Sequence, residues 1–174
     1  AVTGFSAVLT TLLFGTLPTR TELDRFNEQI VGESVLPDPV QALLRDVPPG
    51  AHPMDILRTG VSVLGMTDPD AADHSHEANL RKAIRLLAHI PLVIASAYRR
   101  AHGKPMVWPK RGLTVADNLL WLLTDRHGDE TGKAMGQLLN VSLILYAEHE
   151  FNASTFAARV AASTMTDLHS AIIA

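Results

Sequence analysis

The sequence contains no cysteine among its 174 residues. This excludes a disulfide scaffold, a thiolate zinc site and a cysteine nucleophile, and it fits a reducing compartment. The sequence also lacks a large excess of charge of either sign, because 15 basic and 18 acidic residues leave a net charge of only −3. We therefore expect neither nucleic acid nor an anionic membrane surface as a partner. Because 47% of the residues are hydrophobic, the chain is not intrinsically disordered.

Long hydrophobic runs are also missing. A membrane-spanning helix needs about 18 or more consecutive apolar residues, whereas the most apolar stretch, 138–147, contains Asn140 and Ser142. We interpret that stretch as a core or interface helix. The chain starts at Ala1 without Met and stops abruptly at Ala174. We therefore expect a longer parent chain, whose presequence, if there is one, would precede Ala1.

Apolar residues recur at helical spacing along nearly the whole chain, and no segment has a convincing strand pattern. The length fits one domain of roughly 100–200 residues or two small ones. We predict an all-α fold with about eight helices. They cover residues 5 to about 15, 19–31, 37–45, 53–65, 76–102, 115–123, 131–151 and 153 to the end of the chain.

Local signals set several of these boundaries. Thr19 and Glu22 form a capping box at the start of the second helix, and Ser75 and Thr114 are N-cap candidates for later helices. Pro91 lies inside the longest helical pattern, where it is expected to kink or interrupt the helix.

Metal and zinc-protease motifs fail on spacing. A helical zinc pair needs histidines at i and i+4, but the residue four positions after His149 is Ala153. His74 and His76 could form a pair, yet no third ligand is fixed by spacing, so we interpret them as part of a solvated loop. We expect no metal site and no cofactor.

Three further motif-like segments are also rejected. The segment 128–134 resembles a phosphate-binding loop but is one residue short and lacks the following Ser or Thr. Gly60 and Gly65 resemble the glycines of a nucleophile elbow, but the second glycine is one place late and no strand precedes it. Asn140-Val-Ser142 matches a glycosylation sequon inside a predicted helix, which we attribute to chance.

One polar constellation remains, at the junction of two predicted helices. An apolar helix places Tyr146, Glu148, His149 and Glu150 at its C-terminal end, and the next helix begins near Ser154. A histidine there can donate a hydrogen bond to an anionic or carbonyl ligand, and the following helix N-terminus adds free amides and positive potential. The alternative interpretation is that His149 satisfies a polar neighbour inside the core.

The same segment carries a family resemblance. Residues 148–159 read E-H-E-F-N-A-S-T-F-A-A-R, which resembles the citrate synthase signature E-H-x-x-N-A-S-T-x-x-A-R, and residues 166–171 read T-D-L-H-S-A, similar to the pattern that follows it in the family. Residues 52–59 read H-P-M-D-I-L-R-T, similar to H-P-M-D-x-x-R-T. Residues 14–19 contain the G-x-L-P-T turn. The matches extend over nearly the whole chain and agree with the all-α prediction.

The resemblance implies an acyltransferase that joins acetyl-CoA or propionyl-CoA to oxaloacetate, giving citrate or 2-methylcitrate and CoA. It also implies a mostly helical homodimer with a large and a small domain. The whole chain, 1–174, would be a fragment of the citrate-synthase-like large domain, without the small domain and the C-terminal part. Acyl-CoA would be a substrate, so no cofactor is implied.

The residue that the resemblance implies as an oxaloacetate ligand is His149. Asn152 either helps to shape that pocket or acts as a plain N-cap. Arg58 is interpreted as structural, on a helix at the dimer interface, and Arg159 is expected to pair within the core. The family has two catalytic histidines and a catalytic aspartate. By the resemblance, all three would lie at positions after Ala174. We therefore assign no catalytic residue here and expect the 174 residues alone to be inactive.

Two alternatives stay open at this point. The chain could be a non-catalytic helical dimerisation module derived from the same scaffold, or part of a lyase that cleaves citryl-CoA. We expect a cytoplasmic location, with the mitochondrial matrix as the alternative because a presequence would precede Ala1.

Overall fold

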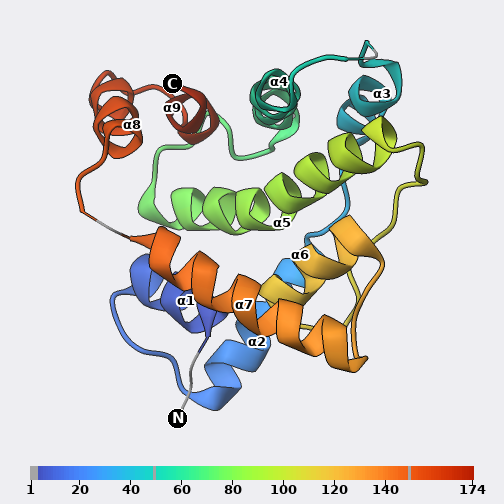
Figure 1. The fold of residues 1–174 in the computed structure, drawn as a ribbon. Helices are drawn as coiled ribbons and strands as arrows, with labels where there is room; N and C mark the ends of the chain where they lie inside the picture. The colour runs from blue at the N-terminus through green and yellow to red at the C-terminus, as the bar shows by residue number, and fades with distance from the viewer. Residues whose placement is uncertain (1–3, 49, 149) are drawn as a thin grey trace. The chain divides into compact units, whose positions relative to one another are not determined.

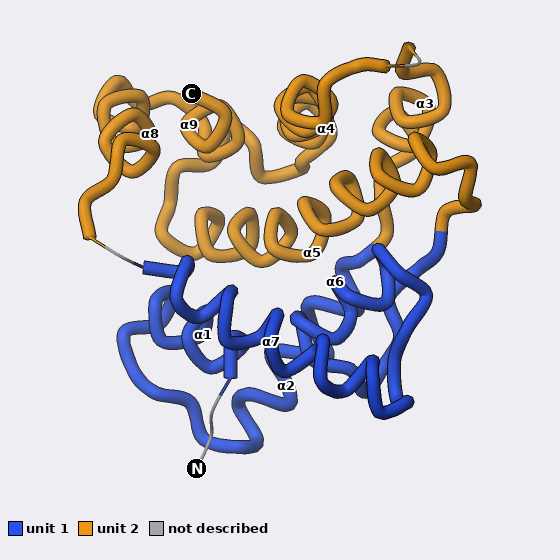
Figure 2. Tube along the Cα trace, viewed as in Figure 1, with its two compact units in different colours: residues 1–34, 107–149 blue, residues 35–106, 150–174 orange. Residues whose placement is uncertain are grey.

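A computed structural model of the chain describes residues 4–48, 50–148 and 150–174. Within these ranges it contains nine α-helices and no strand, which confirms the all-α prediction (Figure 1). The chain divides into two compact units (Figure 2): unit 1 comprises residues 1–34 and 107–149, and unit 2 comprises residues 35–106 and 150–174. The prediction that the whole chain is part of one large domain refers to the longer protein, and it stays a prediction.

Unit 1 is built from two helix pairs that are distant in the sequence. It contains α1 (Phe5–Phe14), α2 (Arg20–Gly32), α6 (Val115–Thr124) and α7 (Glu130–Ala147). Helix α1 contacts the other three helices, and α6 packs along α7 (Figure 1). Apolar side chains from all but α7 are buried in this unit, among them Leu9, Leu23, Phe26, Ile30, Leu120 and Leu122.

Unit 2 is organised around two contacting helices, α4 and α5. It contains α3 (Asp38–Asp46), α4 (Pro53–Thr67), α5 (His76–Ala101), α8 (Ala153–Ser163) and α9 (Leu168–Ile173). Helix α4 contacts α3, α5 and α9. In the described part of the chain, the extensive contact of α8 is with α9. The buried apolar residues include Val61, Leu64, Ile84, Leu92, Val93 and Ala171.

The predicted capping signals operate as expected. The Thr19 N–H donates to Glu22 Oε2 at 2.7 Å, and the Glu22 N–H donates to Thr19 Oγ1 at 3.3 Å, so both halves of the capping box are present. Ser75 caps α5 and Thr114 caps α6 through the same type of bond. These side chains satisfy amides that a helix start leaves without an intrahelical partner.

Two helix ends differ from the prediction. Helix α4 continues past Gly65 to Thr67, because a glycine within a helix weakens it without ending it. The last predicted helix was expected to run to the end of the chain, which is wrong. Helix α8 stops at Ser163, Met165 adopts a φ of 62°, and Asp167 then caps the separate helix α9.

Helix α7 is also shorter than predicted. It ends at Ala147, because Glu148 is extended (φ −154°, ψ 124°), whereas we expected the helix to reach Phe151. Pro91 does not interrupt α5, which is continuous from His76 to Ala101, although its ribbon bends part-way along (Figure 1). Burial of Leu92 and Val93 directly after the proline holds the two halves of the helix in one element.

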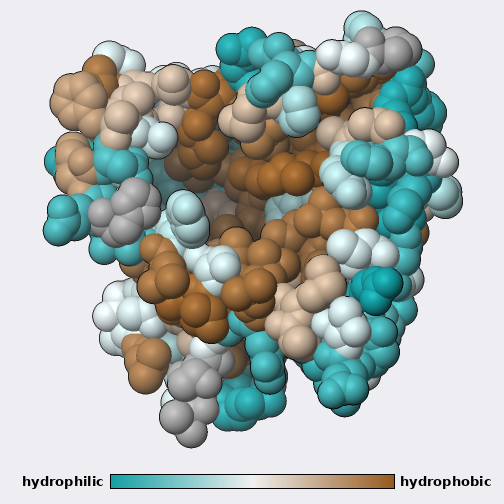
Figure 3. Space-filling model, in the orientation of Figure 1, coloured by the Kyte–Doolittle hydropathy of each residue, from teal (hydrophilic) through white to brown (hydrophobic). Residues whose placement is uncertain are grey.

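One part of the exposed apolar surface lies on α7. Leu138 and Leu145 are 70% and 67% exposed, and Figure 3 shows apolar side chains gathered over this helix. We expected a comparable surface from residues 54–64, but Val61 and Leu64 are buried inside unit 2. Only Met54 at the start of that stretch is largely exposed, because α4 turns its apolar face toward α5.

None of the helices in the described part of the chain combines the length and apolar character needed to cross a bilayer.

Candidate functional site

The predicted oxaloacetate ligand, His149, lies outside the described residues. Its neighbours belong to different units, since Glu148 is in unit 1 and Glu150 in unit 2. The role of His149 as a substrate ligand therefore stays a prediction, and the surrounding geometry is described for the unit 2 side of the junction.

Asn152 forms the N-cap of α8. Its Oδ1 atom accepts a hydrogen bond from the Thr155 N–H at 2.8 Å, and its backbone is extended, with φ −79° and ψ 171°. Its own N–H donates to the carbonyl oxygen of Glu150 at 3.0 Å. The structure thus shows the capping role that the sequence offered as one of two interpretations. Contact of Asn152 with a substrate stays a prediction.

The start of α8 is open to solvent. Ala153, Ser154 and Thr155 are all exposed, and the first turn contains no acidic residue. The amides at a helix N-terminus carry a partial positive charge that favours anions. This helix end, which begins at Ala153, therefore provides a potential that favours an anionic group such as a carboxylate.

The backbone just before this helix is strained. Glu150 has a φ of 83°, a region that residues other than glycine seldom occupy. Such conformations cost about 1–3 kcal/mol and cluster at functional sites.

The two arginines of the family motifs lie at the surface. Arg159 is exposed, and its guanidinium carbon lies 5.0 Å from the centre of the Phe151 ring. The expectation that Arg159 pairs within the core is wrong, because α8 has no buried residue among which it could lie. Arg58 is exposed too and pairs with Asp55 at 2.9 Å. Its place in a dimer interface stays a prediction.

The rejected motifs have structural roles or remain at the surface. His74 and His76 are exposed. Across the described residues, no three His, Asp or Glu side chains are grouped in a way that could hold a metal ion. In the segment 128–134, Asp129 caps α7 by accepting from the Gly132 N–H at 2.9 Å, as a turn before a helix would.

A charged cluster in unit 2 was missed by the sequence analysis. Arg85 on α5 donates two hydrogen bonds to Asp68, at 2.9 and 2.6 Å, and a third to Asp70 at 2.6 Å. Arg81 also binds Asp70, at 2.7 Å. The aspartates lie in a segment with a loop composition and are separated from the arginines by irregular spacings, so no local pattern announced the cluster.

The cluster shifts the pKa values of its members. Burial is the largest single influence and would raise the pKa of Asp68. The hydrogen bonds from Arg85 and the Asp70 N–H, together with the charges of Arg85 and His169, outweigh it, and the pKa is lowered from 3.8. Hydrogen bonds from Arg81 and Arg85 hold the pKa of Asp70 far below its usual range. Burial lowers the pKa of the neighbouring His169 from 6.5, although Asp68 and Asp167 act in the opposite direction. Because every charge here has a partner, we interpret the cluster as structural.

Comparison with known proteins gives a consistent result. The family model described as "Citrate synthase, C-terminal domain" matches residues 2–174. The chain is 37% identical over 169 residues to the citrate synthase of Deinococcus radiodurans, an alignment that covers 97% of the chain and 44% of that protein. It is 40% identical over 168 residues to the 2-methylcitrate synthase of Mycobacterium tuberculosis, covering 97% of the chain and 42% of that protein.

The fold agrees with the sequence match. The crystal structure of citrate synthase from Pyrobaculum aerophilum superposes with a TM-score of 0.88 at 31% identity, covering 99% of the chain and 44% of that protein. The chain spans less than half the length of these relatives. The family match over residues 2–174, the curated relatives and the superposition together show that the chain belongs to the citrate synthase family.

Proposed function

We propose that the protein to which this chain belongs condenses an acyl-CoA with oxaloacetate, so that acetyl-CoA gives citrate or propionyl-CoA gives 2-methylcitrate. The supporting observation is the family match over residues 2–174, joined by relatives named citrate synthase and 2-methylcitrate synthase at 37% and 40% identity. No observation favours the dimerisation module or the citryl-CoA lyase over this acyltransferase.

The reaction defines what the protein must supply. A base removes a proton from the carbon beside the thioester carbonyl, and the resulting enol attacks the keto carbon of oxaloacetate to form a carbon–carbon bond. Donors that stabilise the developing charge lower the barrier. Water then hydrolyses the thioester, releasing CoA. We place the base and the groups that assist it beyond Ala174, so this chain contributes substrate binding.

In this proposal, oxaloacetate binds at the start of α8. His149 donates a hydrogen bond to the substrate. The exposed amides at the start of α8 provide positive potential for one of its carboxylates, and Asn152 holds that helix start in place. The contribution of this chain to binding the dicarboxylate would thus come from one side chain and one helix end.

A thiol-release assay on the full-length protein tests the reaction. With oxaloacetate present, we expect acetyl-CoA or propionyl-CoA to release free CoA, and the ratio of the two kcat/KM values assigns the acyl group. Mass spectrometry of the product should show citrate or 2-methylcitrate. Cleavage of citryl-CoA together with no condensation of either acyl-CoA would reject the proposal.

The substitution His149→Ala tests the binding role. We expect the KM for oxaloacetate to rise at least about tenfold, as loss of a hydrogen bond to a charged group predicts, while the KM for acyl-CoA changes much less. The exposed His76 is the matched control, and His76→Ala should leave both values unchanged.

By calorimetry, the 174-residue chain should bind oxaloacetate weakly at best. Tight binding that His149→Ala does not affect would place the site elsewhere.

We also propose a homodimer. Its support is the apolar surface of α7, where Leu138, Val141 and Leu145 are all more than half exposed (Figure 3), since patches of this kind mark interaction surfaces. Sedimentation velocity should show a dimer, and a clean monomer at high concentration would contradict it.

We place the protein in the cytoplasm, following its bacterial relatives, and cell fractionation with an activity assay tests this location.

A further inference from the structure

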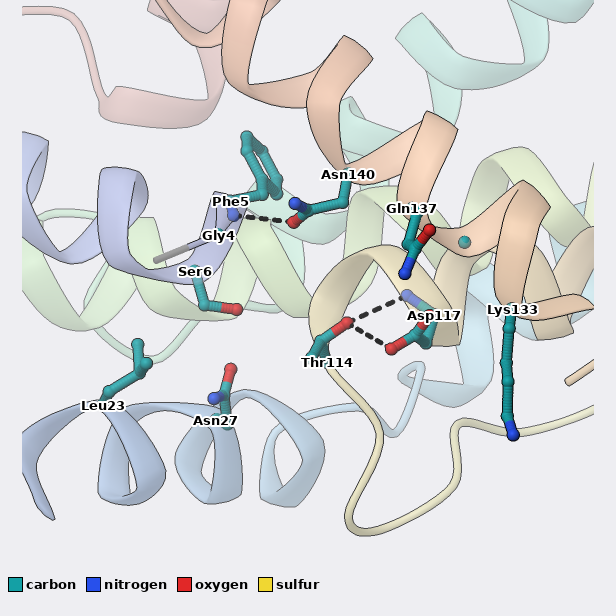
Figure 4. Close-up of a pocket in the computed structure, with 11 residues that line it drawn as sticks. Gly4, Phe5, Ser6, Leu23, Asn27, Thr114, Asp117, Lys133, Gln137 and Asn140 are labelled. Carbon is teal, nitrogen blue, oxygen red and sulfur yellow. Dashed lines mark hydrogen bonds between the residues drawn. The ribbon is translucent and has the colours of Figure 1, made fainter. Parts of the chain in front are cut away.

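Unit 1 contains a cavity with several polar side chains in its wall, which the proposed reaction does not use. Its volume is about 370 Å³, within the range of small-molecule sites. The starts of α1 and α6 line it together with one face each of α2 and α7 (Figure 4). The polar side chains in its wall are Ser6, Asn27, Thr114, Asp117, Lys133, Gln137 and Asn140.

Two buried atoms in this wall have no hydrogen-bond partner among the described residues. They are the Oγ atom of Ser6, which is only 5% exposed, and the Oδ1 atom of Asn27. Figure 4 shows both side chains projecting into the same space. Buried polar atoms are nearly always hydrogen-bonded, and an unsatisfied one costs about as much as a lost hydrogen bond. Two such atoms in one cavity therefore indicate a polar occupant.

The rest of the wall supplies charges of both signs. Asp117 is held by the Thr114 hydroxyl, which donates to it at 2.8 Å. Lys133 is exposed and makes no ion pair with Asp117 in the described part of the chain. Gln137 follows Lys133 by one helical turn, so the two share a face of α7.

Asn140 completes the set of donors. Its Oδ1 atom accepts a hydrogen bond from the Phe5 N–H at 2.8 Å, which fixes the orientation of the amide group (Figure 4). Because the oxygen is engaged, the two N–H donors of the same amide remain for other partners. The wall thus offers a carboxylate, an ammonium group, amide donors and two neutral groups that lack partners.

We propose that this cavity binds a small zwitterion, an amino acid with an uncharged polar side chain. A simple anion or a simple cation would leave one of the two wall charges unmatched, whereas a zwitterion pairs its ammonium with Asp117 and its carboxylate with Lys133. The side-chain amide or hydroxyl of the ligand reaches Asn27 and Ser6. Such a ligand would provide partners for the two buried atoms, Ser6 Oγ and Asn27 Oδ1, and would pair with both wall charges.

Calorimetric titration with L-asparagine, L-glutamine and L-serine tests the site. We expect saturable binding of at least one of them, and binding of L-alanine and of propionamide at least about tenfold weaker. L-alanine lacks the polar side chain and propionamide lacks both charges, so the two comparisons separate the two halves of the recognition.

Variants place the binding in this cavity. Lys133 is exposed, so Lys133→Gln should fold normally and weaken binding at least about tenfold. Asn27→Leu should also weaken binding. Arg126→Gln, an exposed residue of the same unit that does not line the cavity, is the control and should have no effect. Without ligand, Ser6→Ala should be neutral or stabilising, because it removes an unsatisfied hydroxyl.

Two results would overturn the proposal. The first is the absence of saturable binding for all three amino acids up to their solubility limits. The second is binding that neither Lys133→Gln nor Asn27→Leu weakens. Asn152 and the first turn of α8 do not line the cavity. Failure here therefore leaves the proposed condensation activity untouched, and the thiol-release assay decides that activity separately.

Discussion

His169 and Asp68 lie far apart in the sequence, yet the His169 Nε2 atom is 3.5 Å from the Asp68 Oδ2 atom. Their side chains are only 3% and 4% exposed. Asp68 follows α4, His169 lies on α9, and Arg85 of α5 donates to the same carboxylate. One buried carboxylate therefore connects three helices of unit 2, and breaking this connection should affect the stability of the whole unit.

The substitution Asp68→Asn should destabilise the protein by about 2–4 kcal/mol. Removing one partner of a buried ion pair leaves the other charge uncompensated, and the bond from Arg85 to Asp70 recovers part of the loss. Urea unfolding measures the change. The exposed pair of Arg20 and Asp24 provides the control, since Asp24→Asn should cost less than about 1 kcal/mol. Equal losses at the two positions would show that the cluster contributes little.

Stability should fall as the pH drops below 6.5. Burial lowers the pKa of His169 in the folded protein, whereas in the unfolded chain this histidine titrates near 6.5. Below that pH the unfolded state therefore binds more protons than the folded state, and this binding stabilises the unfolded state. Asp68, Asp167, Lys82 and Arg85 act on this ring, and Asp68 keeps its charge until the pH approaches its unfolded value of 3.8. Carboxyl groups with lowered pKa values, such as Glu22, begin to contribute at about pH 5, so the range between 6.5 and about 5.5 reports mainly on the histidine.

Chemical denaturation across that pH range measures this effect. His169→Gln should flatten the dependence of the unfolding free energy on pH, because it removes the group whose pKa differs between the two states. The exposed His76 serves as the control, and His76→Gln should keep the wild-type slope. If His169→Gln kept it as well, another group would be responsible.

Gly60 is required by the packing of α4 on α5. A Cβ atom at Gly60 would lie 2.9 Å from Val93 Cγ1, whereas one at Gly32, in α2, would meet nothing within 4 Å. Gly60→Ala should therefore lower the midpoint of thermal unfolding, with a loss of about 1–2 kcal/mol from overpacking. Gly32→Ala should raise stability by up to about 1 kcal/mol, because it lowers the backbone entropy lost on folding. A stabilising Gly60→Ala would contradict the close contact.

Asn140→Ala should destabilise unit 1 by about 1 kcal/mol, because the start of α1 loses its cap. Gly4 provides no side-chain cap, and the Phe5 N–H is bound by Asn140 from α7 instead. Amide hydrogen exchange should show faster exchange of Phe5 in the variant. Ser142→Ala, two positions further along α7, removes only a bond from the Ser142 hydroxyl to the Leu138 carbonyl and should leave that exchange unchanged.

The sequence by itself determined the features that depend on local chemistry. Helical periodicity gave the all-α class, and side chains that bind amides two or three residues onward fixed the starts of α2, α5 and α6. Such interactions act between residues that are close in the sequence, so a short segment is enough to predict them. The family motifs were local for the same reason, and they led to His149 and Asn152 through resemblance.

Only the tertiary structure decided which distant residues meet. The pairing of Asp68 with Arg85 and His169, the capping of α1 by Asn140, and the gathering of Ser6, Asn27 and Lys133 around one cavity all join segments with no shared local pattern. The burial of Val61 and Leu64 and the exposure of Arg159 were decided in the same way. A helix's own sequence shows that it has an apolar face, but the neighbour that covers that face is chosen when the helices pack.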